Sequence, residues 1–127
     1  MALILIVEDY PNLQKIYSIA ATEAGHKVLL AKDGTEALKQ ATEHNPDLIL
    51  LDLLMPEVNG IEFLTKYDLK KHPETKVIVY SNIDTPDLRH RLSDLGANLY
   101  FNKSEHTPDE LMGVIENMLK TPPATTS

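Results

Sequence analysis

The segment LILLDLLMPEVNG, residues 48–60, places four apolar residues directly before an acid, Asp52. An uninterrupted apolar run of this kind is typical of a strand buried on both faces of a parallel sheet. Burying an ionised carboxylate costs on the order of several kcal/mol unless the charge is paired. The position of Asp52 at the end of such a strand therefore indicates a charged partner, a bound cation or both.

Composition limits the classes of protein to which the chain can belong. Its 127 residues are enough for one domain with a proper core, and the 43% hydrophobic content is that of a folded protein. Cysteine is absent, which excludes disulfides, thiolate metal sites and a cysteine nucleophile. The net charge of −7 argues against direct binding of nucleic acid. The short apolar N-terminus fits neither a signal peptide nor a membrane span, so we expect a cytoplasmic protein without membrane insertion.

Short apolar runs alternate with segments in which apolar residues recur three and four positions apart. We expect strands at 2–7, 27–31, 47–51, 76–80 and 98–101. The helical pattern occupies the stretches 13–20, 37–41, 63–67, 88–95 and 111–118. Five strict βα alternations predict an α/β fold, a doubly wound (βα)5 five-stranded parallel sheet with helices on both faces. We expect the domain to cover residues 1–120, with 121–127 as a disordered tail or truncated linker.

Residues with capping chemistry mark the expected helix ends. Helix starts are predicted at Pro11, at Asp33 with Glu36, at Asn59 with Glu62, at Thr85 and at Thr107 with Glu110. Helix ends are predicted at Gly25, Asn45-Pro46, His72-Pro73 and Gly96.

Polar residues leave the strands at their carboxyl ends, where open doubly wound sheets bind ligands. They are Glu8, Asp9, Asp52, Ser81 and Lys103. A carboxylate at the end of a buried strand is tolerable if an ammonium pairs with it and a divalent cation shares its charge. Crowded oxygen ligands without histidine or cysteine suit a hard octahedral ion, so the pattern predicts a Mg²⁺ site.

Four motifs in order resemble the receiver domain of two-component response regulators. They are LIVED (5–9), LILLDLLMP…G (48–60), VIVYSN (77–82) and GANLYFNK (96–103). The resemblance covers residues 1 to about 120 and implies a flavodoxin-like sheet with strand order 2-1-3-4-5. It also implies that Asp52 accepts a phosphoryl group from a sensor histidine kinase or a histidine phosphotransfer protein. Such a domain is a phospho-acceptor rather than an enzyme, because it catalyses only its own phosphorylation and dephosphorylation.

The same resemblance implies a role for each matching residue. Glu8, Asp9, Asp52 and the backbone carbonyl of Leu54 would hold Mg²⁺, with Glu8 acting through water. Since the transferring phosphoryl group spreads negative charge over its oxygens, positioning and cations supply most of the catalysis.

The hydroxyl of Ser81 and the ammonium of Lys103 would bind phosphoryl oxygens. Tyr100 would turn inward on phosphorylation and remodel the face made by the fourth helix, the fifth strand and the fifth helix, to which an output protein would bind.

Simpler interpretations of these residues remain open. Glu8 and Asp9 could cap the first helix, Lys103 could be a solvated loop lysine, and Tyr100 could be a half-buried aromatic on an edge strand. We expect the histidines to be solvated, because they show no metal-ligand spacing; they are His26, His44, His72, His90 and His106.

Two other functions also remain open. Ser104 follows the lysine where the family usually has a cis proline, and Asn82 replaces a small residue. These departures leave room for a pseudo-receiver that binds partners without phosphorylation. A phosphatase with an aspartate nucleophile needs a second acid two residues later, and that position is Leu54.

Overall fold

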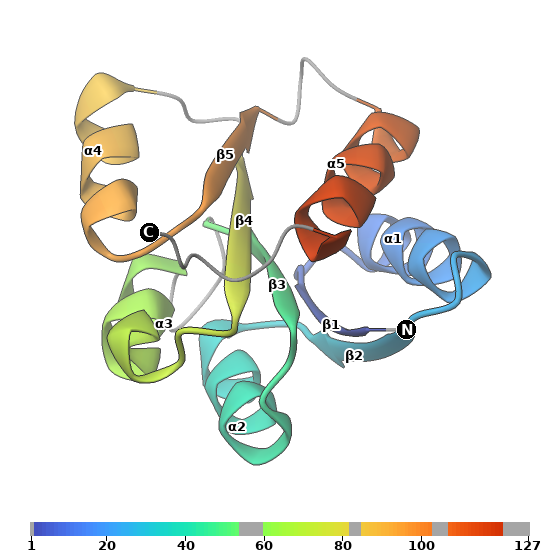
Figure 1. Ribbon diagram of the computed structural model, residues 1–127, viewed down its shortest axis with the longest axis horizontal. Helices are drawn as coiled ribbons and strands as arrows, with labels where there is room; N and C mark the ends of the chain where they lie inside the picture. Colours follow the sequence, from blue (N-terminus) through green and yellow to red (C-terminus); the bar gives the residue numbers. More distant parts are fainter. Residues whose placement is uncertain (1, 54–59, 82–84, 103–106, 121–127) are drawn as a thin grey trace.

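The sheet and its two layers of helices are described by a computed structural model that covers residues 2–53, 60–81, 85–102 and 107–120 (Figure 1). Five parallel strands lie in the order β2-β1-β3-β4-β5. The strands are β1 (Leu3–Val7), β2 (Lys27–Ala31), β3 (Leu48–Asp52), β4 (Lys76–Ser81) and β5 (Leu99–Asn102). The helices are α1 (Pro11–Glu23), α2 (Gly34–His44), α3 (Gly60–Tyr67), α4 (Pro86–Asp94) and α5 (Pro108–Lys120), with a 3₁₀ turn at Leu69–Lys71. The predicted doubly wound sheet and its strand order are confirmed.

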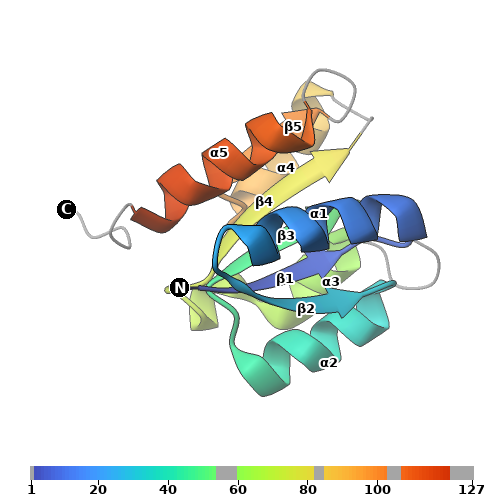
Figure 2. The ribbon, with the colours of Figure 1, turned by 90° about the vertical axis from the view of Figure 1, so that its right-hand side faces the viewer.

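Helices cover both faces of the sheet, as right-handed crossovers require. Helices α1 and α5 lie on one face, and α2, α3 and α4 lie on the other (Figures 1 and 2). Each face has its own apolar core, one containing Tyr17 and Ile115 and the other containing Ala37, Phe63 and Leu92. No helix in the described part of the chain is long and apolar enough to cross a membrane.

Strand β3 explains the apolar run with which the sequence analysis began. All five of its residues are buried. Leu48 and Leu50 face the core under α1 and α5, whereas Ile49 and Leu51 face the core under α2 and α3. Because both faces are covered, every residue of the strand must be apolar until it ends at Asp52. All five predicted strands agree with the observed ones to within one residue at each end.

The helix starts follow the predicted capping chemistry. Asp33 accepts a hydrogen bond from the backbone N–H of Glu36 at 2.8 Å. Thr107 and Glu110 form a complete capping box, with N···O distances of 3.2 Å and 2.8 Å. Thr85 caps α4 through its hydroxyl. Each bond satisfies a backbone N–H group that has no partner inside its helix.

The third helix ends earlier than predicted. The His72-Pro73 pair was expected to end it, but α3 stops at Tyr67 because Asp68 adopts a left-handed backbone conformation with φ of 59°. The chain then makes the 3₁₀ turn, and His72 is the C-terminal cap of that turn. An aspartate tolerates this conformation better than most residues. The expected cap Asn59 lies outside the described residues.

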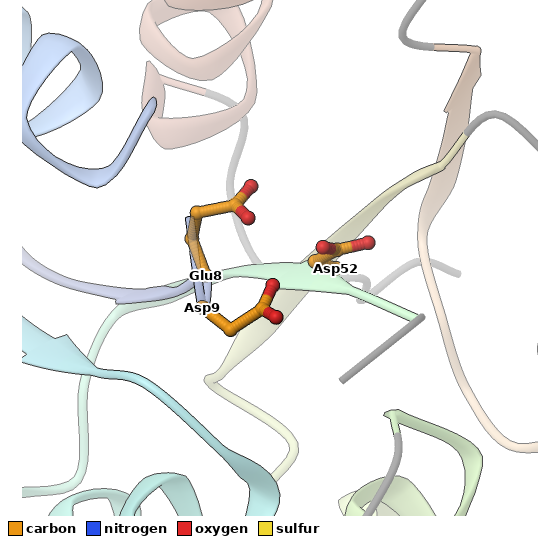
Figure 3. A group of neighbouring side chains, drawn as sticks. All are labelled: Glu8, Asp9 and Asp52. Carbon is orange, nitrogen blue, oxygen red and sulfur yellow. The ribbon is translucent and has the colours of Figure 1, made fainter. Parts of the chain in front are cut away.

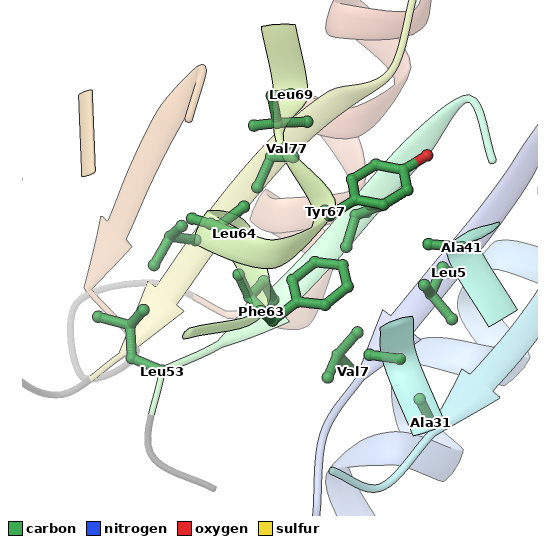
Figure 4. Packing of buried hydrophobic residues seen from close by; sticks show 14 of the residues in the cluster. Leu5, Val7, Ala31, Ala41, Leu53, Phe63, Leu64, Tyr67, Leu69 and Val77 are labelled. Atoms are coloured by element: carbon green, nitrogen blue, oxygen red, sulfur yellow. The ribbon is translucent and has the colours of Figure 1, made fainter. Parts of the chain in front are cut away.

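The α3 side of the core contains an aromatic stack. Phe63 and Tyr67 are one turn apart, and their rings lie 5.6 Å apart at an interplanar angle of 8° (Figure 4). Of the residues of α4, in contrast, only Leu92 is fully buried. Helices α3 and α4 are therefore held on this face by very different amounts of buried apolar surface.

Two histidines differ from the prediction that all five are solvated. His72 is partly buried and stacks on Tyr67, with ring centroids 4.0 Å apart. His44 and His90 are exposed as predicted, and His106 lies outside the described residues. The face of an imidazole ring packs well on an aromatic ring. The spacing of histidines along the sequence does not predict such a contact.

His26 is the clearer correction, because its side chain is only 7% exposed. Its Nδ1 accepts a hydrogen bond from the backbone N–H of Ala2 at 3.1 Å. Its Nε2 lies 2.5 Å from Oε2 of Glu116 on α5. The ring therefore links the start of β1 to α5, and burial without these partners would be costly.

Candidate functional site

Three carboxylates meet at the carboxyl end of the sheet. Glu8 and Asp9 follow β1, and Asp52 ends the neighbouring strand β3. One oxygen from each carboxylate lies within 4.8 Å of those of the other two, and the three side chains point into the same space (Figure 3). Glu8 is 1% exposed and Asp52 is 4% exposed, whereas Asp9 faces solvent. Like charges this close and this buried favour a cation among them.

The sheet positions these acids through its pairing and pleat. In β1 and β3, Ile6 and Leu50 face the core under α1 and α5 and are paired in register. Because side chains alternate along a strand, Glu8 and Asp52, each two residues later, belong to the same face. The acid at the end of the apolar run and the acid after the first strand are thus brought side by side by the parallel register.

A residue that the sequence analysis did not single out, Tyr80, joins this group. It is paired in register with Asp52, and it is 1% exposed. Its hydroxyl donates a hydrogen bond to Oε1 of Glu8. The backbone N–H of Tyr10 donates to the other oxygen of Glu8, Oε2, at 3.1 Å.

The electrostatics of the site keep the Tyr80 hydroxyl protonated. Burial, followed by the nearby Glu8 carboxylate, raises the pKa of Tyr80 far above its ordinary value of 10.0. Burial is also the main cause of the raised pKa of Tyr17, whose ring packs edge-on against Tyr80 at 5.3 Å. At neutral pH the hydroxyl of Tyr80 is therefore a hydrogen-bond donor to Glu8.

The start of α1 is connected to the same strand end. The side-chain amide of Gln14 donates to the backbone carbonyls of Glu8 and Ala31, at 3.1 Å and 3.3 Å. The N-terminal cap of α1 is Tyr10, not Glu8 or Asp9. Glu8 therefore accepts hydrogen bonds from a buried hydroxyl and a loop amide while the helix begins after it, and its position beside Asp52 is fixed from several sides.

Ser81 and Tyr100 occupy the two strands farther along the sheet. Ser81 ends β4, next to the strand of Asp52, and is 1% exposed. Tyr100 lies on the edge strand β5 with a buried hydroxyl, and the guanidinium carbon of Arg89 lies 4.7 Å from the centre of its ring. Other residues named in the sequence analysis lie outside the described part of the chain, among them Leu54, Asn82, Lys103 and Ser104.

The donor set fits a hard divalent cation. All three groups offer carboxylate oxygen, two of them from buried positions. Mg²⁺ prefers oxygen ligands, takes one or two carboxylates directly and retains several waters. The exposed side of Asp9 leaves such waters a route to solvent. The three carboxylates can therefore hold a divalent cation beside the buried side chain of Asp52.

The family model of the response regulator receiver domain matches residues 4–116. The transcriptional regulatory protein KdpE of Mycobacterium tuberculosis is 36% identical over 104 residues, which are 81% of this chain and 45% of KdpE. The response regulator ArlR of Staphylococcus aureus is 35% identical over 124 residues, 97% of this chain and 55% of ArlR. The chain thus spans about half the length of these relatives.

Solved structures give the same result for the fold. A response regulator receiver domain protein from Methanospirillum hungatei superposes with a TM-score of 0.86 at 25% identity, covering 94% of each chain. The receiver domain of Francisella response regulator 1452 gives a TM-score of 0.85 at 25% identity, covering 94% of this chain and 98% of that one.

Proposed function

The chain belongs to the response regulator receiver domain family of two-component systems, and from this premise we propose that Asp52 is its phospho-acceptor. The donor would be the phosphohistidine of a sensor histidine kinase or a histidine phosphotransfer protein. The observation that carries the proposal is the buried Asp52 carboxylate, within 4.8 Å of the carboxylates of Glu8 and Asp9 at the carboxyl end of the sheet.

Transfer of the phosphoryl group requires little covalent chemistry from the protein. A carboxylate oxygen of Asp52 would attack phosphorus in line, forming the O–P bond as the N–P bond to the donor imidazole breaks. Asp9, Asp52 and the backbone carbonyl of Leu54 would hold Mg²⁺, with Glu8 acting through water, and the ion would supply positive charge to neutralise the phosphoryl oxygens. The Ser81 hydroxyl and the Lys103 ammonium would each donate to a phosphoryl oxygen, so that positioning and charge supply most of the rate. The resulting aspartyl phosphate would hydrolyse slowly at the same site.

Output would come from the face formed by α4, β5 and α5. A hollow of about 260 Å³ lies between α4 and β5, lined in part by Arg89 and Tyr100. Movement of Ser81 toward the phosphoryl group would make room for the Tyr100 ring to turn farther inward and release its contact with Arg89. A protein partner would then bind the altered face. Beryllofluoride, a mimic of the phosphoryl group, should shift the NMR signals of Tyr100 and of the α4 amides.

Phosphorylation is tested with a small-molecule donor. Incubation with acetyl phosphate and Mg²⁺ should add the mass of one phosphoryl group to the parent chain. The control variant Asp33→Asn should gain the same mass, because it changes an acid that caps α2 and does not belong to the cluster of three carboxylates. Asp52→Asn should show no added mass. If the folded parent also gains no mass, the chain is a binding module that uses the receiver fold without phosphorylation.

A further inference from the structure

The hydroxyl of Tyr80 reaches across the strand that carries Asp52. In the sheet, β3 lies between β1 and β4, so Tyr80 and Glu8 belong to strands that are two spacings apart. At about 4.8 Å per spacing this is roughly 10 Å. A tyrosine and a glutamate together can span this distance only when both side chains lie on the same face and extend toward each other. The hydrogen bond between Tyr80 and Oε1 of Glu8 shows that they do.

The surroundings hold the Tyr80 ring in this orientation. Its ring contacts the Tyr17 ring edge-on, at a centroid distance of 5.3 Å and an interplanar angle of 75°. It also belongs to the buried core that contains Ile6 and Leu50. The ring cannot rotate away without disturbing this packing, so the hydroxyl is presented to Glu8 by a rigid support.

Both oxygens of Glu8 then have defined directions. Oε1 accepts from Tyr80, and Oε2 accepts from the N–H of Tyr10 at 3.1 Å. Carboxylate oxygens retain a further lone pair for a cation or for a cation-bound water. Groups that donate to a metal-ligating carboxylate fix its orientation, and their loss commonly weakens metal binding about 10–100-fold.

We propose that Tyr80 is a positioning residue of the divalent-cation site, because it fixes the Glu8 carboxylate across Asp52. The inference rests on the proposed function in that it takes the three acids to be a Mg²⁺ site. It adds a residue from β4 whose role is to preform the site before the cation arrives. A phenylalanine at this position would retain the packing and lose only the donor.

The test is the Mg²⁺ affinity of Tyr80→Phe, measured by isothermal titration calorimetry without any phosphoryl donor. We expect an affinity at least about tenfold weaker than that of the parent. The matched control is Tyr67→Phe, which removes a buried hydroxyl from the core on the other face of the sheet and should bind Mg²⁺ like the parent. In the absence of Mg²⁺, the NMR signal of the Tyr10 amide should also move in Tyr80→Phe, because that amide donates to the released carboxylate.

A second pair of variants separates positioning from packing. Glu8→Asp keeps the charge but shortens the side chain by one methylene, so it can no longer meet the Tyr80 hydroxyl. In that background, Tyr80→Phe should cause no further loss of Mg²⁺ affinity. If Tyr80→Phe binds within twofold of the parent and the Tyr10 amide does not move, Tyr80 is only a packing residue and the inference is wrong. If the folded parent does not bind Mg²⁺ at all, the proposed function fails and the inference fails with it.

Discussion

Replacing Gly60 with alanine would test how closely α3 packs on the strand end that carries Asp52. Gly60 is the first residue of α3, and its N–H donates to the carbonyl of Leu53 at 3.2 Å. A Cβ at Gly60 would lie 2.9 Å from Cδ2 of Leu53 and 3.0 Å from both the carbonyl oxygen of Asp52 and Cα of Leu53. Two of these three atoms belong to the backbone, so the helix or the strand end must move.

The expected loss of stability follows from this overlap. Forcing an extra carbon into a packed site costs about 1–3 kcal/mol. With an unfolding entropy of roughly 2.1 cal/mol/K per residue, a chain of 127 residues loses about 7 °C in melting temperature for about 2 kcal/mol. The matched control is Gly113→Ala, in the interior of α5, where a Cβ meets nothing within 4 Å. Alanine is favoured over glycine in a helix by roughly 0.5–1 kcal/mol, so this variant should melt about 2–4 °C higher.

Differential scanning calorimetry of the parent and the two variants, in one chelator-treated buffer, measures both shifts. The two glycine-to-alanine changes should move the melting temperature in opposite directions. If Gly60→Ala melts within about 1 °C of the parent or above it, there is room for a Cβ at this position. The argument that α3 packs tightly against the strand end of Asp52 would then be refuted.

Three further predictions concern stability. In chelator, Asp52→Asn should melt at a higher temperature than the parent, because one of three crowded carboxylates loses its charge. At saturating Mg²⁺ it should melt at a lower temperature than the parent, because a ligand of the ion is lost. Calorimetry in both buffers measures the two differences. His26→Ala should lower the free energy of unfolding by about 1–3 kcal/mol in urea titrations, and Glu116→Gln should cost less because an amide still offers His26 an oxygen. Burial raises the pKa of Tyr67 above its ordinary value of 10.0, so the unfolded chain loses that proton first. The stabilisation from this proton is therefore present below about pH 10 and is lost as the pH rises above that value. In urea unfolding curves, Tyr67→Phe should lose less stability than the parent when the pH is raised from about 9 to about 11.

The fold was predictable from the sequence because its signals are local and repeated. The buried run before Asp52 needs only the rule that strands covered on both faces are apolar throughout. Capping residues such as Thr107 and Glu110 act within four residues of each other, so their geometry follows from spacing alone. The early end of α3 was not predicted, because no sequence pattern indicates the left-handed conformation of Asp68. The His72-Pro73 pair is a stronger helix-end signal and led to the later boundary.

Contacts between distant segments were harder to predict. The acids after β1 and β3 could be placed together because parallel strands end at one edge of the sheet. Tyr80 was not found because it precedes the strand-end residue Ser81, and its place beside Asp52 depends on a strand register that the sequence does not give. The contact between His26 and Glu116 could not be predicted from strand ends, because Glu116 is 90 residues away on a helix. The rotation of that helix about its axis is set only by packing.

The single fully buried side chain of α4 has a consequence for local opening of the native state. Burying one leucine contributes about 1.5–3 kcal/mol, so lifting α4 off the sheet at Leu92 exposes far less apolar surface than lifting α3, which buries Phe63, Leu64 and Tyr67. Hydrogen exchange should therefore proceed through sub-global opening in α4 while α3 remains protected. An element so lightly anchored can be displaced by a signal of a few kcal/mol, and the rest of the molecule need not loosen for that to happen.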